Sequence, residues 1–364
     1  MRGKKSLKVG ITIGDINGIG PEVILKSLKD KRMLGAITPI IYGLESALSY
    51  YKKKTGLTDV ELVTIKEAVK SRKGKINVIN VSTENIEVQE GKESNSSGKV
   101  AVRALELAAK DISTGAIDVI VTAPISKIVC QNAGFKFQGH TEYFSSLSNG
   151  AEALMLLNSS IMKIALVTTH VALKDVSDGI SIEKIINKTK IFDQSLKKDF
   201  GVRKPKIAVL SLNPHSGEDG KMGTEEKEII IPAINKLKNE GIMAFGPFPS
   251  DGFFGSEARK DFDGILSMYH DQGLTVFKAL SFDEGVNYTS GLPIVRTSPD
   301  HGTAFDIAGK GLASETSMRN AIYLAVDVFR SRAFYKESSR NPLEINKPIK
   351  KQKDEVKPRG LKKN

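Results

Sequence analysis

The sequence predicts an α/β fold with two α/β/α domains and a mainly parallel sheet, and three observations support this. The chain has 364 residues, and since domains of about 150 residues are common, this length favours two domains. Hydrophobic residues make up 40% and charged residues 26% of the chain, as in globular proteins that bury a sizeable core. Short apolar runs alternate with helical patterns, which is typical of strands covered by helices on both faces.

Seven apolar runs have the length of buried strands and are bounded by Gly, Asp, Pro or Lys. They cover residues 9–13, 39–42, 76–81, 119–122, 164–168, 207–212 and 265–268. Helical patterns lie between them. In residues 99–112 apolar side chains recur at i, i+3 and i+4 spacing. Residues 21–28 begin with Pro and Glu, which are favoured in the first turn of a helix.

The positive charge of the chain is concentrated at its two ends. The formal net charge is +12, of which residues 1–8 carry +4 and residues 347–364 carry +6. We therefore predict a basic N-terminal extension (1–7), a body of two α/β subdomains with uncertain boundaries (8–340) and a basic, disordered tail (341–364). A nucleic-acid-binding domain would carry its charge as a stripe on the folded body. We therefore do not expect a nucleic-acid partner, although RNA or protein binding by the basic ends stays an alternative.

The compartment is predicted from the cysteine count and from hydropathy. Cys130 is the only cysteine, so the chain has no intrachain disulfide, as is usual in a reducing compartment. No run approaches the ~18 apolar residues that cross a bilayer. The basic N-terminus lacks the apolar segment of a signal peptide. We expect a cytoplasmic protein without a membrane partner.

Three of the five histidines follow predicted strands. His170 ends KIALVTTH, His215 ends KIAVLSLNPH and His270 ends DGILSMYH. In open α/β sheets ligands bind beyond the carboxyl ends of strands, and three neutral imidazoles are a recognised ligand set for a catalytic divalent cation. The pattern therefore favours a metal site. The alternative for each histidine alone is an ordinary hydrogen-bonded residue, and the sequence does not show that the three strands are neighbours.

A fourth histidine lies in a segment suited to anion binding. In FQGHTEYF, Gly139 allows close approach of the backbone, and His140 and Thr141 precede an expected helix from Glu142. Helix N-terminal amides together with an imidazole bind phosphate or carboxylate. A simple helix cap is the alternative.

Polar residues in apolar surroundings follow His270. Lys278, Asn287 and Arg296 fall within nineteen positions, which favours a pocket for a phosphorylated or carboxylated small molecule, whereas long side chains reaching solvent are the alternative. Asp251, in GPFPSDGFFG, is a candidate proton-transfer or metal-orienting carboxylate, or else a turn-capping residue.

The chain has no standard nucleotide motif. Neither Gly-x-Gly-x-x-Gly after the first strand nor Gly-x-x-x-x-Gly-Lys-Ser/Thr is present. The glycine-rich segment GITIGDINGIGPE has a different spacing; it holds a phosphate or forms a tight turn. We therefore do not predict a standard Rossmann dinucleotide site.

Taken together, these motifs resemble the 4-hydroxythreonine-4-phosphate dehydrogenase family of pyridoxal phosphate (vitamin B6) biosynthesis. The resemblance covers residues 8–335. Its segments are GITIGDINGIGPEV, TAPISK, FQGHTEY, VTTHVALKDV, LNPHSGEDGKMGTEE, GPFPSDGFF, MYHDQGLTVFKAL and VNYTSGLPIVRTSPDHGTAFDIAGKG. Ile16 departs from the Pro that is usual in the first glycine loop, and the tail after about Asn341 lies outside the pattern.

The resemblance implies both a fold and a set of site residues. It implies an isopropylmalate dehydrogenase-like fold, a homodimer, and an active site in an interdomain cleft near the dimer interface. The metal-ligand motifs match at His170, His215 and His270, with ligands drawn from both subunits, and the substrate-binding motifs match at His140, Thr141, Lys278, Asn287 and Arg296. HGTAFDIAGKG resembles the loop that the isocitrate and isopropylmalate dehydrogenases place around the adenosine half of NAD. The cofactor-binding candidates are therefore His301, Gly302, Thr303 and Asp306.

The implied reaction needs NAD and one divalent metal ion (Zn, Mg, Co or Mn) at each active site. It is the oxidation of 4-phosphohydroxy-L-threonine at its C3 hydroxyl, followed by loss of CO2 to give 3-amino-2-oxopropyl phosphate. A paralogous enzyme acting on erythronate or threonate 4-phosphate is the nearest alternative, because it would use the same metal, NAD and phosphate-binding residues.

Overall fold

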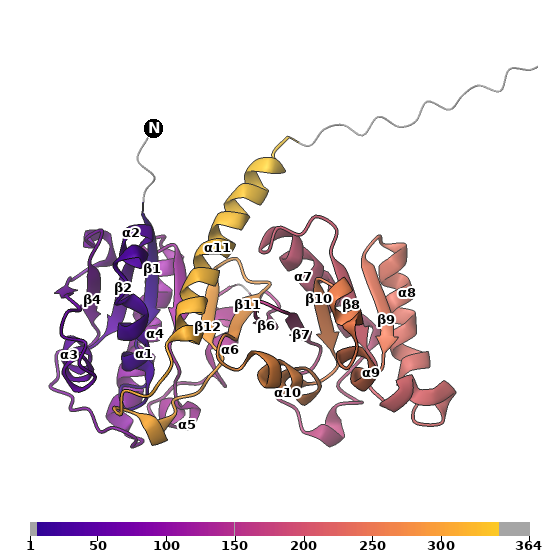
Figure 1. Cartoon of the computed structure of the whole chain (residues 1–364), viewed down its shortest axis with the longest axis horizontal. Coiled ribbons are helices and arrows are strands. Elements are labelled where there is room, and N and C mark those ends of the chain that lie inside the picture. The colour runs from indigo at the N-terminus through magenta and orange to yellow at the C-terminus, as the bar shows by residue number, and fades with distance from the viewer. Residues whose placement is uncertain (1–5, 149, 342–364) are drawn as a thin grey trace, which may run out of the picture.

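A single twisted sheet runs the length of the molecule (Figure 1). The computed structural model describes residues 6–148 and 150–341. Most of the predicted N-terminal extension and the tail from residue 342 onward lie outside the described residues. Within the described part, twelve strands are ordered β3-β4-β2-β1-β5-β12-β11-β6-β7-β10-β8-β9. The strands are β1 Leu7–Thr12, β2 Ile37–Gly43, β3 Leu62–Thr64, β4 Ile76–Asn80, β5 Val119–Thr122, β6 Leu154–Asn158, β7 Lys163–Leu166, β8 Lys206–Leu210, β9 Met243–Phe248, β10 Gly264–Ser267, β11 Val286–Ser290 and β12 Arg296–Pro299.

Helices cover the sheet along its whole length. They are α1 Gly20–Leu28, α2 Lys31–Ala36, α3 Glu45–Lys54, α4 Asn95–Ser113, α5 Lys127–Asn132, α6 His140–Ser146, α7 Ile182–Lys198, α8 Ile231–Asn239, α9 Ser250–Phe254, α10 His270–Ser281 and α11 Thr316–Ser338. In one half α4 packs on β1, β2 and β5. In the other half α7 packs on β6, β10 and β11, and α8 packs on β9. The long helix α11 packs on the central strands β5, β11 and β12 (Figure 1).

The predicted α/β fold with a mainly parallel sheet is confirmed. Eight of the eleven strand pairings are parallel. The seven predicted strands overlap β1, β2, β4, β5, β7, β8 and β10, and the predicted helices at 21–28 and 99–112 lie within α1 and α4. The helix expected from Glu142 begins two residues earlier, at His140, so His140 and Thr141 form its first turn. These strands were predictable because both of their faces are buried, so nearly every position is apolar.

The sequence prediction did not include β3, β6, β9, β11 or β12. The two central strands among them, β11 (VNYTS) and β12 (RTSP), consist largely of polar residues although most of them are buried. Asn287, Arg296 and Ser298 of these strands line a cavity, described below, and Tyr288 and Thr297 form buried hydrogen bonds. The apolar pattern that marks a buried strand is therefore missing there.

A buried polar network joins α7, β11 and α11 beside these central strands. The Asp199 carboxylate follows α7 and accepts hydrogen bonds from Ser195 Oγ at 2.6 Å, Tyr288 OH at 2.7 Å and Arg332 Nε at 2.7 Å. Arg332 also donates to the backbone carbonyls of Pro293 and Ile294. Because every partner of the buried carboxylate is a donor, the network fixes the end of α7 against α11.

No helix in the described part of the chain is long and apolar enough to span a membrane.

Candidate active site

A cavity of about 330 Å³ lies over the central strands. Nine of the thirteen residues predicted for the site line it: His140, Thr141, His170, His270, Lys278, Asn287, Arg296, His301 and Gly302. The other four, His215, Asp251, Thr303 and Asp306, are not part of its wall. The structure therefore brings the proposed substrate-binding residues together around one space, although they are spread over more than 150 positions of the sequence.

Strand register explains why these side chains share one face of the sheet. Asn287 of β11 pairs directly with Ser298 of β12, and directly paired residues point to the same side. Arg296 lies two positions from Ser298, so it points the same way. Met155 of β6 pairs with Thr289, two positions from Asn287. Polar side chains of β11 and β12, together with Met155 of β6, thus form one continuous wall of the cavity.

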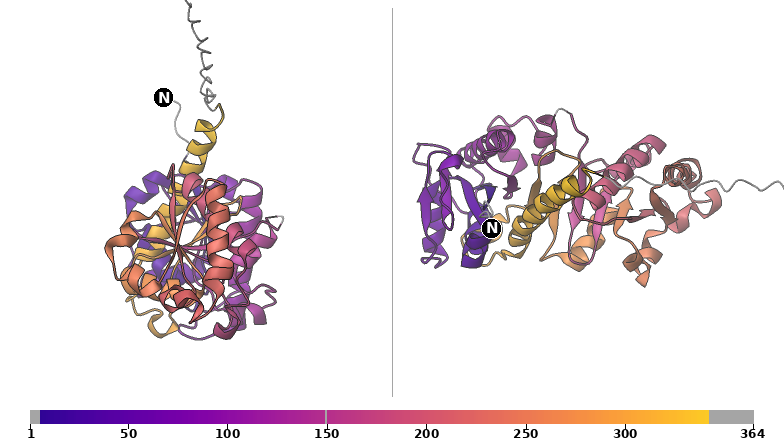
Figure 2. Two further views of the ribbon diagram at one scale, coloured as in Figure 1. Left: turned by 90° about the vertical axis from the view of Figure 1, so that its right-hand side faces the viewer. Right: turned by 90° about the horizontal axis from the view of Figure 1, so that it is seen from above.

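The twist of the sheet brings the loops of both halves to this cavity. The antiparallel pairings β12–β11, β11–β6 and β6–β7 reverse strand direction between the halves. The strands fan around the long axis, as the left view of Figure 2 shows. Residues after β5 and β12 and residues after β7 and β10 therefore reach the same cavity.

Arg296 is a buried cation without a carboxylate partner. Its side chain is only 3% exposed. Its guanidinium donates to the hydroxyls of Thr122, at 2.6 and 3.1 Å, and Thr289, at 3.0 Å. No described carboxylate forms an ion pair with it. Burial lowers the pKa of Arg296 to about 10, against the opposing effect of the Glu142 charge, because the charged form loses more by losing its hydration than it gains from that carboxylate. Such a site is suited to an anionic ligand.

Three unpaired buried polar atoms surround the same cavity. His140 Nε2, Asn287 Oδ1 and His301 Nε2 have no hydrogen-bond partner among the described residues. Burial, and then the positive charges of Arg296 and Lys127, hold the pKa of His140 well below its usual range, so its ring is neutral. Unpaired buried polar groups are rare in folded proteins, so these atoms indicate a bound polar ligand.

Two of the three predicted metal ligands lie side by side. The rings of His170 and His270 have centroids 5.9 Å apart. Their strands β7 and β10 are parallel neighbours, and β8, which leads to His215, pairs with the other side of β10. His270 Nδ1 lies 2.7 Å from Asp271 Oδ1, a contact that orients the ring with Nε2 free.

His215 lies apart from this pair within one chain. It is exposed, in the segment Pro214–Gly220, where His215, Ser216, Glu218 and Asp219 all have positive φ. Left-handed backbone at consecutive non-glycine residues is strained, and such strain clusters at functional sites. No group of three His, Cys, Asp or Glu residues in the described chain is arranged to hold a metal ion.

Asp251 and two of the four cofactor-loop candidates, Thr303 and Asp306, also lie outside the cavity wall. Asp251 is exposed in the first turn of α9. The carbonyl of Thr303 accepts a hydrogen bond from the backbone N–H of Ile19 at 2.9 Å, which ties the loop to the first glycine-rich segment. A Cβ on Gly18 would lie 2.7 Å from that carbonyl, so the close contact requires glycine there. Asp306 is exposed.

Several residues of the cavity wall are not among those predicted from the sequence. The titratable ones are Lys127, Glu142 and Asp300. Asp300 directly follows β12 and precedes His301 in SPDHGT, and a polar residue directly after a strand is a candidate site residue. The polar sequence of β12 does not indicate a strand, so the sequence does not mark Asp300 in this way.

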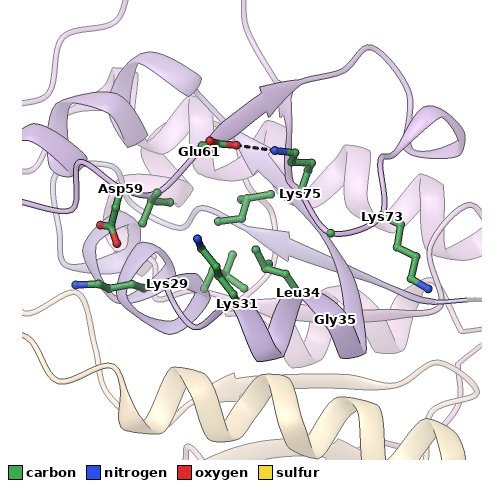
Figure 3. Close-up of a pocket in the computed structure, with 12 residues that line it drawn as sticks. Lys29, Lys31, Leu34, Gly35, Asp59, Glu61, Lys73 and Lys75 are labelled. Atoms are coloured by element: carbon green, nitrogen blue, oxygen red, sulfur yellow. Dashed lines mark hydrogen bonds and ion pairs between the residues drawn. The ribbon is translucent and has the colours of Figure 1, made fainter.

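A second pocket lies at the amino ends of β2 and β4, away from all of these residues (Figure 3). Lys29, Lys31, Lys73 and Lys75 line it above an apolar floor. All four lysines are exposed, and Lys75 pairs with Glu61 at 2.6 Å. Exposed charges are screened by water, so nothing here matches the desolvated cation and unpaired atoms of the central cavity.

Comparison with known proteins gives one consistent family. Residues 36–325 match the family model described as pyridoxal phosphate biosynthetic protein PdxA. The 4-hydroxythreonine-4-phosphate dehydrogenase of Bacteroides thetaiotaomicron is 49% identical over 341 residues, which are 93% of each chain. A protein of Oceanobacillus iheyensis, provisionally named a D-threonate 4-phosphate dehydrogenase, is 40% identical over 88% of this chain and 97% of its own.

Solved structures agree with this result. The crystal structure of 4-hydroxythreonine-4-phosphate dehydrogenase from Klebsiella pneumoniae superposes with a TM-score of 0.78 and 34% identity, covering 90% of this chain and 99% of that one. The terephthalate 1,2-cis-dihydrodiol dehydrogenase of Burkholderia xenovorans has the same fold, with a TM-score of 0.59 at 23% identity over 89% of this chain and 98% of that one.

Proposed function

Since the chain belongs to the PdxA family of pyridoxal phosphate biosynthetic proteins, we propose that it is a 4-hydroxythreonine-4-phosphate dehydrogenase. In this proposal it oxidises the C3 hydroxyl of 4-phosphohydroxy-L-threonine with NAD and releases CO2, giving 3-amino-2-oxopropyl phosphate. The observation that carries it is Arg296, a buried guanidinium whose described partners are hydroxyls alone. A phosphate would supply the missing negative charge and accept two parallel hydrogen bonds.

Further polar groups of the wall complete an anion site around Arg296. The neutral ring of His140, the Thr141 hydroxyl, the Asn287 amide and the Lys278 ammonium line the same space. His140 Nε2 and Asn287 Oδ1 would gain partners when the substrate binds. With the phosphate fixed by these groups, the rest of the substrate is directed toward His170 and His270.

His170 and His270 supply two of the three imidazoles that a divalent cation would need. His170 and His270 would hold it, and partial burial lowers the pKa of His170, which favours the neutral form that binds metal. When bound, the ion would supply positive charge that stabilises an alkoxide and an enolate. We propose that the third imidazole is His215 of a second copy of the chain. Val171 and Leu173, 46% and 75% exposed beside His170, provide apolar surface for such a homodimer.

NAD fits the segment after β12. The unpaired His301 Nε2 and the adjoining Gly302 line the cavity, and Thr303 is anchored on the first glycine-rich segment. We propose that residues 301–306, with Asp306 at the exposed end, contact the cofactor. Its chemistry would be to accept hydride from C3.

The function is tested by NADH formation with a panel of four-carbon phosphates, with and without a chelator. The proposal expects 4-phosphohydroxy-L-threonine to be the best substrate and chelation to abolish turnover. D-Threonate 4-phosphate is the second candidate, because a relative carrying that provisional name is 40% identical. A strong preference for a substrate without the amino group would replace the first assignment with this one.

The shared metal site is tested by mixing inactive variants. His215→Ala mixed with His170→Ala, or with His270→Ala, should regain about a quarter of wild-type activity, because half of the dimers are mixed and each holds one intact site. A light-scattering mass of a monomer, or no regain in either mixture, would refute the shared site.

We further propose that residues 8–340 form two subdomains about this cleft and that the enzyme works in a reducing compartment, consistent with its buried free Cys130.

A further inference from the structure

Asp300 lies in the wall of the cavity and has no role in the function proposed so far. It directly follows β12, and its side chain is 12% exposed. It shares the wall with Lys278, His270 and His301.

The backbone of Asp300 is held firmly. Its N–H donates to Ser317 Oγ at 3.1 Å, and Ser317 Oγ donates to the carbonyl of Gly285 at 2.6 Å. A Cβ on Gly285 would approach the Asp300 Cβ to 3.4 Å, so the two segments are in contact. The carboxyl group therefore has a defined position at the cavity wall.

The carboxylate oxygens of Asp300, in contrast, accept no hydrogen bond from any described residue. Lys278 Nζ lies 3.9 Å from Oδ1 and donates to the backbone carbonyl of Asp300 at 3.4 Å instead. A carboxylate that served only to hold the fold would be paired, as Asp199 is. Asp300 is free to exchange a proton with a bound molecule.

Burial brings the pKa of Asp300 close to neutral pH. Burial raises its pKa to about 6, against the opposing effects of Lys278 and then His270. The adjacent residue in the wall, His301, has its pKa lowered by burial, so that its ring is neutral. A group with a pKa near the working pH is suited to accept and return a proton.

We propose that Asp300 is the proton acceptor and donor of the reaction. This inference rests on the proposed function. In the oxidation, the O–H bond of the C3 hydroxyl breaks and its proton moves to the Asp300 carboxylate, while the hydrogen on C3 leaves with its electron pair as hydride to NAD, forming the ketone. The bond between C2 and the carboxyl carbon then breaks and CO2 leaves. The electron pair of that bond forms the enolate over C2 and C3, and Asp300 returns its proton to C2.

The other acids near the cavity are less suited to this role. Glu142 lies in the first turn of α6, and its charge acts on both Arg296 and His170, so it would balance the positive charge of the anion and metal sites. Asp251 is exposed and outside the wall. Asp271 contacts the ring of His270.

The test compares Asp300→Asn with wild type in kcat, in kcat/KM from pH 5 to 9, and in substrate affinity by calorimetry. Asp300→Asn should lower kcat by about 100- to 10,000-fold, leave substrate Kd within about threefold of wild type, and lose the acidic limb near pH 6. The exposed Asp283→Asn is the matched control and should behave as wild type. Asp300→Ala should regain part of its turnover with added formate, a small carboxylate that a purely structural residue would not need.

The outcomes separate the two proposals. Wild type that forms no NADH with any of the four-carbon phosphates overturns the proposed function and this role together. Active wild type with Asp300→Asn at more than a tenth of its kcat, or with the acidic limb unchanged, overturns the role of Asp300 alone. Loss of activity in a folded Asp300→Ala that formate does not restore also overturns it; circular dichroism and thermal unfolding establish the folding of each variant.

Discussion

Replacing Arg296 with Met tests whether this guanidinium is reserved for an anionic ligand. Burial lowers the pKa of Arg296 from 12.5 to about 10, and each unit corresponds to 1.36 kcal/mol. The charge therefore destabilises the ligand-free fold by about 3 kcal/mol, an order-of-magnitude value. Because the folded state binds this proton less tightly than the unfolded state, the penalty is present at every pH below about 10.

Methionine fills a similar volume without the charge. Arg296→Met also removes hydrogen bonds to Thr122 and Thr289, each worth about 1 kcal/mol. We therefore expect the ligand-free variant to be about 1–2 kcal/mol more stable than wild type. The assay is urea unfolding at pH 7.5 in chloride buffer, repeated with inorganic phosphate. Phosphate at ten times its Kd should stabilise wild type by about 1.4 kcal/mol and leave the variant nearly unchanged.

The exposed Arg340→Met serves as the matched control, because Arg340 is in water at the end of α11 and its loss should change neither value. The reasoning is refuted if Arg296→Met is less stable than wild type without phosphate and phosphate stabilises both proteins equally.

Four further predictions follow from the structure. Dialysis against a chelator should abolish NADH formation, and adding back Zn, Mg, Co or Mn should restore it; full activity after verified metal removal would exclude the metal role. Asp199→Ala should lower the free energy of unfolding by about 3–5 kcal/mol, because Arg332 is then buried without its partner. Glu61→Ala, which breaks an exposed ion pair, should lower it by less than about 1 kcal/mol. Equal losses of the two variants in urea unfolding would contradict a stabilising role of the Asp199 network. Lys26 Nζ donates hydrogen bonds to the carbonyls of Gly311 and Ala313 at 2.9 and 2.7 Å, at the end of the proposed cofactor loop HGTAFDIAGKG. Lys26→Met should therefore raise KM for NAD about tenfold without changing KM for the phosphate substrate; an unchanged KM for NAD would argue against a role of Lys26 in holding this loop. Asp300 binds its proton more tightly in the folded than in the unfolded state, so wild type should lose up to about 3 kcal/mol of folding free energy as the pH rises from 4 to 6. Asp300→Asn should not show this loss; parallel stability curves of the two proteins would refute the raised pKa.

The apolar strands and the strand-end histidines were predictable because their signals are local. A run such as residues 119–122, buried on both faces, reads as a strand without knowledge of its neighbours. Residues 287 and 296 were recognised as cations or amides in apolar surroundings, but β11 and β12, which carry them, were not recognised as strands. Their polar residues are accommodated in the sheet because they either face the cavity, as Asn287 and Arg296 do, or form buried hydrogen bonds, as Tyr288 does with Asp199. Both the cavity and these partners come from distant parts of the chain.

The α/β class, the family and nine of the residues that line the cavity follow from the sequence, because they depend on residue type and on the order along the chain. Which of those residues meet depends on the tertiary structure. Strand register placed Asn287 and Arg296 on one face, and the twist of the sheet carried His170 and His270 to the same space while leaving His215 apart. It also left the Asp300 carboxylate unpaired beside Lys278. Such pairings join residues far apart in the chain, and burial changes the pKa of a group only once those contacts have formed.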